Sequence, residues 1–215
     1  MSDKNSFYYQ LNYFSEHGFE VIAPDFPGFG RSAPIEEEWS VGDYARWLIQ
    51  LIGCLHITMP HIIAHSFGAR VAFKALSCNN FADRLVITGG AGLVKERTPA
   101  YRRKVRAYRA VKKFAPRFAE RHFGSEEYRT LPPVMRGSYK KIVNEDLRSC
   151  AALVANKTLL LYGMDDKVTP PSEEGEIFNG LIAGSRLITM PGGHFCFCEH
   201  PEQFNNLVLT FLTED

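Results

Sequence analysis

The chain has 215 residues, 45% of them hydrophobic, and a formal net charge of +1 at pH 7. This length favours one domain with a sizeable core, and the near-neutral charge argues against a general affinity for nucleic acid or an anionic membrane surface. No stretch approaches the ~18 apolar residues that a membrane span needs, and the first residues are polar, unlike a signal peptide. The five cysteines are odd in number and lack metal-ligand spacing, so we expect a cytoplasmic protein without a metal.

Short β-branched runs alternate with longer helical periods along most of the chain, a pattern typical of a mostly parallel sheet flanked by helices. We expect a helix from Ser6 to His17, closed by Gly18, and then a strand from Glu20 to Ala23. Ser40 is suited to cap the next helix, with Asp43 in its first turn. The sequence therefore predicts an α/β fold from its first quarter onward.

The same alternation continues to the end of the chain. A strand is predicted to end at His65, and a helix to follow it from Ser66 to Ser77. The remaining strands and the last helix are expected at Arg84–Thr88, Lys157–Tyr162, Ser185–Met190 and Pro201–Leu212.

Residues 95–141, here called the basic segment, differ in composition from the rest of the chain. They contain fifteen Lys and Arg against four Glu and no Asp, a local net charge of +11. Apolar residues at steps of three and four from Tyr101 to Phe118 predict an amphipathic helix, which Pro116 interrupts. We expect a helical lid inserted into a core formed by residues 1–94 and 142–215, with its apolar stripe towards the site and its charges in water.

The strongest local motif is Ala64-His65-Ser66-Phe67-Gly68, between an apolar strand and a helical run. A serine at such a strand-to-helix turn, between small residues, is typical of a nucleophile elbow. There the amide of Phe67 and the helix dipole can stabilise an oxyanion. The alternative is a serine that only caps a helix.

A serine nucleophile needs a base and an orienting acid, and both follow on later loops. Asp166 lies in a loop after the strand that ends at Tyr162, and His194 lies in a Gly-Gly-His loop after the next strand. Asp165 competes with Asp166 for the acid. We predict that Ser66, His194 and Asp166 converge at the carboxyl ends of the strands, with separations of about 3 Å.

Together these motifs resemble the α/β-hydrolase family. Gly163, Asp166 and Pro170 match the acid loop of that family, which favours Asp166 over Asp165, and the segment from Pro24 to Ser32 is similar to its D-x-x-G-x-G-x-S turn. The first glycine of the elbow is replaced by Ala64. The remaining histidines are expected at the surface or at element boundaries: His17, His56, His61, His122 and His200.

The resemblance also implies that three early strands and the His-Gly loop, which supplies a second oxyanion donor, are missing. One of those strands would lie between Glu20–Ala23 and His61–His65. We therefore expect that these two strands pair directly, that a second chain supplies a strand, or that the chain is a fragment.

The predicted function is hydrolysis of a carboxylic ester or related acyl bond, with a small-molecule acyl substrate and no cofactor. Loss of one oxyanion donor predicts weak activity, since such a loss commonly costs about 10²- to 10³-fold in turnover. Alternatives are an incomplete, hydrolase-like protein and a binding module that uses the basic segment. A homo-oligomer is possible.

Overall fold

The computed structural model describes residues 4–94, 99–115, 128 and 130–214. Its helices and strands alternate along the chain as the sequence predicts, with boundaries that differ by a few residues. In chain order they are η1 (Lys4–Phe7), α1 (Tyr8–Glu16), α2 (Val41–Cys54), β1 (Ile62–His65), α3 (Phe67–Leu76), β2 (Arg84–Thr88), α4 (Pro99–Phe114), α7 (Pro133–Val143), α8 (Arg148–Ala151), β3 (Lys157–Gly163), η2 (Pro171–Gly175), α9 (Glu176–Leu181), β4 (Arg186–Met190), α10 (Cys196–Glu199) and α11 (Pro201–Thr213).

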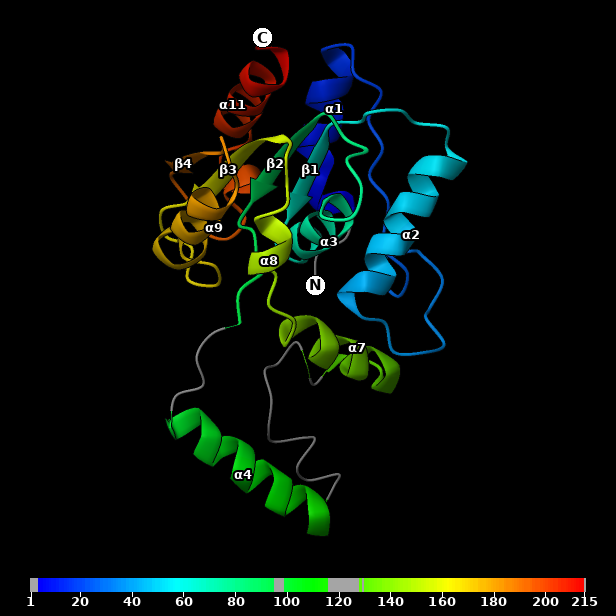
Figure 1. Cartoon of the computed structure of the whole chain (residues 1–215), viewed down its shortest axis with the longest axis vertical. Coiled ribbons are helices and arrows are strands. Elements are labelled where there is room, and N and C mark those ends of the chain that lie inside the picture. Colours follow the sequence, from blue (N-terminus) through cyan, green and yellow to red (C-terminus); the bar gives the residue numbers. More distant parts are fainter. Residues whose placement is uncertain (1–3, 95–98, 116–127, 129, 215) are drawn as a thin grey trace.

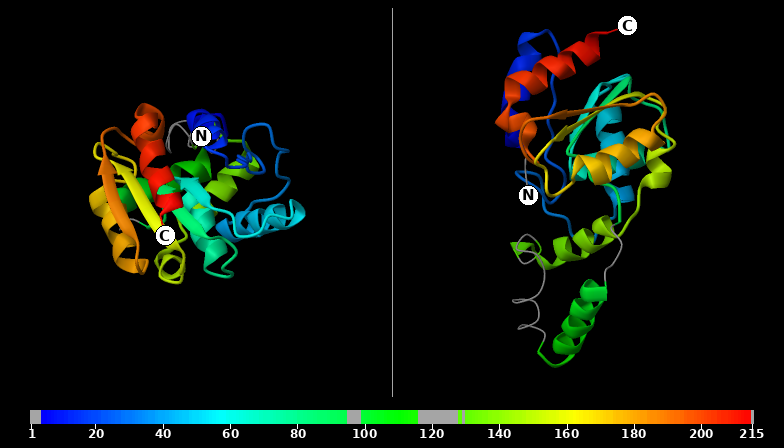
Figure 2. Two further views of the ribbon diagram at one scale, coloured as in Figure 1. Left: turned by 90° about the horizontal axis from the view of Figure 1, so that it is seen from above. Right: turned by 90° about the vertical axis from the view of Figure 1, so that its left-hand side faces the viewer.

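The four described strands form one parallel sheet in the order β1-β2-β3-β4. Helices α3, α8 and α9 cover one face of this sheet, and α1 and α11 lie side by side on the other (Figures 1 and 2). Because all four strands run in the same direction, their carboxyl ends meet at one edge of the sheet. Loops that follow the strands are therefore brought together.

Strand residues alternate between two hydrophobic layers, as expected for a sheet covered on both faces. In β2, Leu85 and Ile87 pack towards α3, whereas Val86 packs towards α11. In β3, Leu160 and Leu159 divide in the same way. The sheet is thus held from both sides, which gives the loops at its edge a rigid base.

Local signals for two helix ends are confirmed. Ser40 and Asp43 form a reciprocal capping box at the start of α2, in which the Ser40 amide donates to Asp43 Oδ2 over 2.7 Å. Gly18, after α1, has a φ of +85°, a conformation that glycine adopts without steric cost.

The strand predicted at Glu20–Ala23 is wrong. These residues are not assigned to any strand, and no described strand pairs with the outer edge of β1. A run of apolar residues becomes a strand only where a partner accepts its hydrogen bonds. Ile22 is 46% exposed and Ile63 is half-buried, so the side chains on this side of β1 are partly in contact with water.

The basic segment contains the predicted amphipathic helix. In α4, Val105, Tyr108 and Val111 are half-buried, whereas Arg103 and Arg106 are exposed. The helix stands apart from the sheet, beyond α7 (Figure 1). Among the described residues, α4 therefore does not cover the carboxyl ends of the strands as a lid would. Residues 95–98, 116–127 and 129 of the basic segment lie outside the described part.

A buried arginine on α3, the helix that follows Ser66, contacts the chain on both sides of the basic segment. Arg70 on α3 donates to the carbonyl oxygen of Leu93 before the segment, over 3.4 Å, and to those of Ile142 and Glu145 after it, over 3.0 and 2.9 Å. The carboxylate of Glu174 accepts from the Leu93 amide over 3.2 Å. The Arg70 side chain thus holds together the two points at which the chain leaves the core for the basic segment and returns from it.

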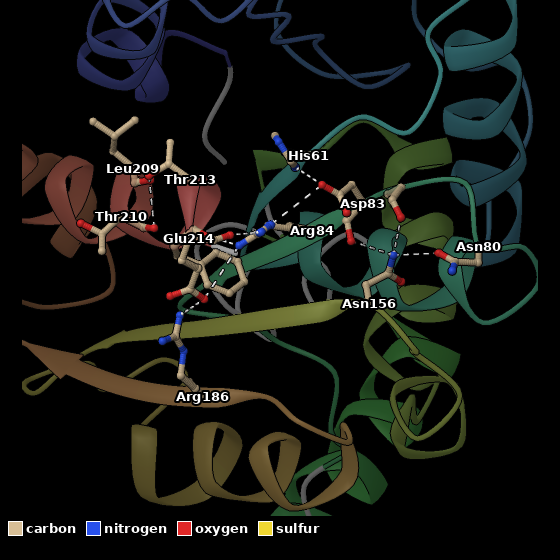
Figure 3. A network of polar contacts seen from close by, with 12 residues as sticks. His61, Asn80, Asp83, Arg84, Asn156, Arg186, Leu209, Thr210, Thr213 and Glu214 are labelled. Carbon is tan, nitrogen blue, oxygen red and sulfur yellow. Dashed lines mark hydrogen bonds and ion pairs between the residues drawn. The ribbon is translucent and has the colours of Figure 1, made fainter.

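At the opposite end of the sheet, two arginines hold the C-terminal helix α11 to the strands (Figure 3). Arg84, the first residue of β2, donates to the carbonyl oxygens of Phe211 and Glu214. Arg186, the first residue of β4, lies 2.6 Å from the Glu214 carboxylate. Carbonyl groups at the end of α11 thereby obtain the donors that the helix itself cannot supply.

Candidate active site

The structure brings the three residues singled out by sequence together at the carboxyl edge of the sheet. Ser66 directly follows β1, and its Oγ lies 3.0 Å from Nε2 of His194. Nδ1 of His194 lies 2.8 Å from Oδ2 of Asp166. Both distances match the predicted value of about 3 Å. An ionised carboxylate can only accept a hydrogen bond, so Nδ1 of His194 carries the proton and donates it to Asp166. Nε2 of the neutral imidazole is then free to accept the hydrogen bond of the Ser66 hydroxyl.

Ser66 has the strained backbone of a sharp strand-to-helix turn, with φ of 49° and ψ of −108°. A positive φ is uncommon for a residue that is not glycine. A Cβ added at Gly68 would lie 3.6 Å from the Cβ of Ala64, so the two positions approach each other across the turn. This is an ordinary van der Waals separation, so the methyl group of Ala64 fits the turn without crowding.

Asp166 is 3% exposed, whereas the competing Asp165 is exposed. The amides of Val168 and Thr169 donate to Oδ1 of Asp166 over 2.8 and 2.9 Å, and the Thr169 hydroxyl lies 2.8 Å from Oδ2. Burial raises the pKa of the Asp166 carboxyl, but hydrogen bonds from His194 and Thr169 outweigh it and lower the pKa to about 2. The acid is therefore ionised at neutral pH.

The loops that carry Asp166 and His194 are in direct backbone contact. A Cβ at Gly163 would lie 2.2 Å from the carbonyl oxygen of Gly193, so no other residue fits at this position. The Asp165 amide also donates to the Gly192 carbonyl over 3.0 Å. This contact fixes the acid loop against the base loop.

Phe67 is the first residue of α3, a helix of ten residues. The first amides of a helix have no acceptor within the helix, and the dipole adds partial positive charge at this end. The amide of Phe67 is therefore available beside Ser66 to an oxygen that gains negative charge.

His65 is a site residue whose place sequence reasoning missed, because its partner is 129 residues away. It is 7% exposed, and its Nε2 lies 2.9 Å from the carbonyl oxygen of His194. The expectation for three other histidines is confirmed, since His17, His56 and His200 are exposed. His61 is half-buried at 3.5 Å from Asp83, and His122 lies outside the described residues.

The burial of His65 predicts a pH-dependent stability. Burial lowers the pKa of His65 from 6.5 to about 4, and His194 adds to this shift. An unfolded chain takes up a proton at His65 in this range and the folded protein does not, so the free energy of unfolding falls as the pH falls from 6.5 to about 4. We expect His65 to contribute about 3 kcal/mol to this fall.

Urea unfolding of the wild type and of His65→Phe at pH 6.5 and pH 4 measures this contribution. The wild type should lose more stability than the variant between the two pH values, whatever their difference at pH 6.5. An identical pH dependence in both proteins would contradict the prediction.

Other features of the described residues offer no rival site. A hollow of about 530 Å³ lies between β4 and α11 and is lined by Arg186, Ile188 and Phe211, among others, but not by Ser66, Asp166 or His194. The described ranges contain no group of three His, Cys, Asp or Glu that could hold a metal ion. Within those ranges, every helix is too short or too polar to cross a membrane.

A model of the alpha/beta hydrolase family matches residues 3–207. The chain belongs to the α/β-hydrolase family. Within it, the AB hydrolase superfamily protein YisY of Bacillus subtilis is 24% identical to this α/β-hydrolase over 232 residues, 95% of this chain and 85% of that protein.

Two further relatives carry more specific names. The 2-hydroxy-6-oxononadienedioate/2-hydroxy-6-oxononatrienedioate hydrolase of a Pseudomonas species is 22% identical over 97% of this chain and 82% of its own length. An esterase from Exiguobacterium antarcticum has the same fold, with a TM-score of 0.79 and 22% identity over 99% of this chain and 88% of that one. This α/β-hydrolase is thus a hydrolase by family, with a hydrolase of a dienedioate among its relatives and an esterase among the proteins that share its fold.

Proposed function

We propose that the protein is a serine hydrolase that cleaves a carboxylic ester or related acyl bond of a small molecule through an acyl-enzyme intermediate. The observation that carries the proposal is the continuous hydrogen-bonded chain from Ser66 through His194 to Asp166, with 3.0 Å and 2.8 Å between the bonded atoms. This arrangement activates a serine hydroxyl, which is a weak nucleophile on its own.

In the proposed reaction, Oγ of Ser66 attacks the acyl carbon while Nε2 of His194 takes its proton. Asp166 holds the imidazole in the required tautomer and stabilises the imidazolium. The amide of Phe67 donates to the oxyanion of the tetrahedral intermediate. His194 then returns the proton to the leaving alcohol, and a water molecule releases the acyl group by the same steps in reverse.

The names of the relatives support hydrolysis and suggest a starting set of substrates. Short carboxylic esters test the proposal directly, because one relative in fold is an esterase. The weak turnover expected from a single oxyanion donor stays a prediction. If the protein were an incomplete hydrolase, it would form the acyl-enzyme slowly or not at all.

Labelling with a fluorophosphonate tests the nucleophile, because the reagent reacts covalently with an activated serine. The wild type should be labelled at Ser66, and Ser66→Ala should not be labelled. Ser77→Ala is a matched control, since Ser77 flanks the other end of the same helix, where its hydroxyl donates to the Lys74 carbonyl and contacts the Cys78 thiol. Equal labelling of wild type and Ser66→Ala would refute the proposed function.

A further inference from the structure

His65 connects the strand that carries Ser66 to the loop that carries His194. It is the last residue of β1 and precedes Ser66 directly. Its Nε2 lies 2.9 Å from the carbonyl oxygen of His194. A carbonyl oxygen can only accept a hydrogen bond, so Nε2 of His65 carries the proton and donates it.

The His65 ring also packs against the loop and the turn that follows it. Its centroid lies 4.6 Å from that of His194, 4.9 Å from that of Phe195 and 4.8 Å from that of Phe197. The side chain therefore holds the loop by one hydrogen bond and by three ring contacts.

The loop needs such support because two glycines precede His194. Gly192 has a φ of +107°, and glycine loses more conformational freedom on ordering than any other residue. Two further hydrogen bonds of this loop lead to nearby residues or to the acid loop. The Glu199 carboxylate accepts from the Gly193 amide over 2.9 Å, and the Gly192 carbonyl accepts from the Asp165 amide over 3.0 Å. The hydrogen bond from His65 instead links the main chain of His194 to the strand end that carries Ser66.

We propose that His65 is a positioning residue, which sets the distance between Ser66 Oγ and His194 Nε2 by binding the main chain of His194. The inference rests on the proposed function. Displacement of a reacting group by about 1 Å can cost about 10²-fold in rate. A hydrogen bond that fixes His194 beside Ser66 therefore has a large effect on turnover.

The role requires a neutral side chain. The ionisable groups whose charges act on His65 are His194 and Asp166. A charge on His65 would oppose the imidazolium that forms on His194 during the reaction, and burial keeps the pKa of His65 at about 4. A neutral donor fixes the loop without raising the energy of that intermediate.

Two substitutions at position 65 separate the donor from the ring. His65→Phe keeps an aromatic ring but has no donor, and His65→Gln supplies an amide donor without a ring. We expect His65→Phe to lower kcat and the rate of fluorophosphonate labelling by about 10- to 100-fold, with KM changed less than twofold. His65→Gln should recover most of both rates. His61→Phe, at the other end of the same strand region, is the matched control and should match the wild type.

Comparable kcat values for His65→Phe and the wild type would overturn the proposal. A loss in His65→Gln as large as that in His65→Phe would also overturn it, because a restored donor would then not restore the rate. If a variant does not fold, ¹⁵N NMR of the wild type decides, since a proton on Nδ1 instead of Nε2 excludes the hydrogen bond to His194. A wild type that is not labelled at all would refute the proposed function itself, and the NMR result would still report on His65.

Discussion

Asp166→Asn should lower kcat for ester hydrolysis by about 10⁴-fold, with little change in KM. The asparagine amide can face Nδ1 of His194 with its oxygen or its nitrogen, and in the second case the imidazole must carry its proton on Nε2. That tautomer cannot accept the proton of Ser66. The carboxylate also stabilises the imidazolium in the intermediate, and an amide lacks the charge to do so.

Asp165→Asn is the matched control, because the neighbouring residue is exposed and the substitution is the same. We expect its kcat to stay within about twofold of the wild type, as for most surface substitutions. Steady-state hydrolysis of a short ester by the three proteins at pH 7 provides the measurement. A larger loss in Asp165→Asn than in Asp166→Asn would reverse the assignment of the acid.

Arg70→Met should lower the free energy of unfolding by about 3 kcal/mol or more, because each buried carbonyl group left without a donor costs about 1 to 3 kcal/mol. Arg70 is 6% exposed, and the negative charges of Glu174, Glu145 and Asp146 act on it. Methionine fills much of the volume but leaves three carbonyl oxygens without this donor. Glu174, only 3% exposed, also loses a favourable positive charge.

Arg46→Met is the control for a change of the same type at the surface. The Arg46 side chain is 72% exposed and its ion pair with Asp43 lies on a helix surface, where such pairs contribute about 0.3 to 0.5 kcal/mol. Urea unfolding followed by circular dichroism compares the two variants with the wild type. Similar losses of unfolding free energy in Arg70→Met and Arg46→Met would mean that Arg70 does not hold the two ends of the basic segment to α3.

The site could be predicted from the sequence because each of its parts is encoded locally. The turn around Ser66, the acid loop and the glycine-rich loop before His194 each follow a strand, and parallel strands bring such loops together without any further information. Asp166 could be chosen over Asp165 only through the resemblance to a family, since spacing alone allowed either.

The errors arose where structure depends on distant partners. Glu20–Ala23 has the composition of a strand, but no described strand lies where it would have to pair. The position of α4 depends on what its apolar stripe contacts, which periodicity does not specify. His65 was given little role in the site because adjacent side chains at a tight turn diverge, and its hydrogen-bond partner lies 129 residues away.

The sequence separation within the site also affects how the protein folds. Ser66 and His194 are 128 residues apart and follow the first and last strands of the sheet, with β2 and β3 between those strands. Contacts between distant residues form late because they must overcome the entropy of closing long loops. We therefore expect labelling of Ser66 to report on completion of the whole sheet, and a refolding chain to regain its helices before Ser66 becomes reactive.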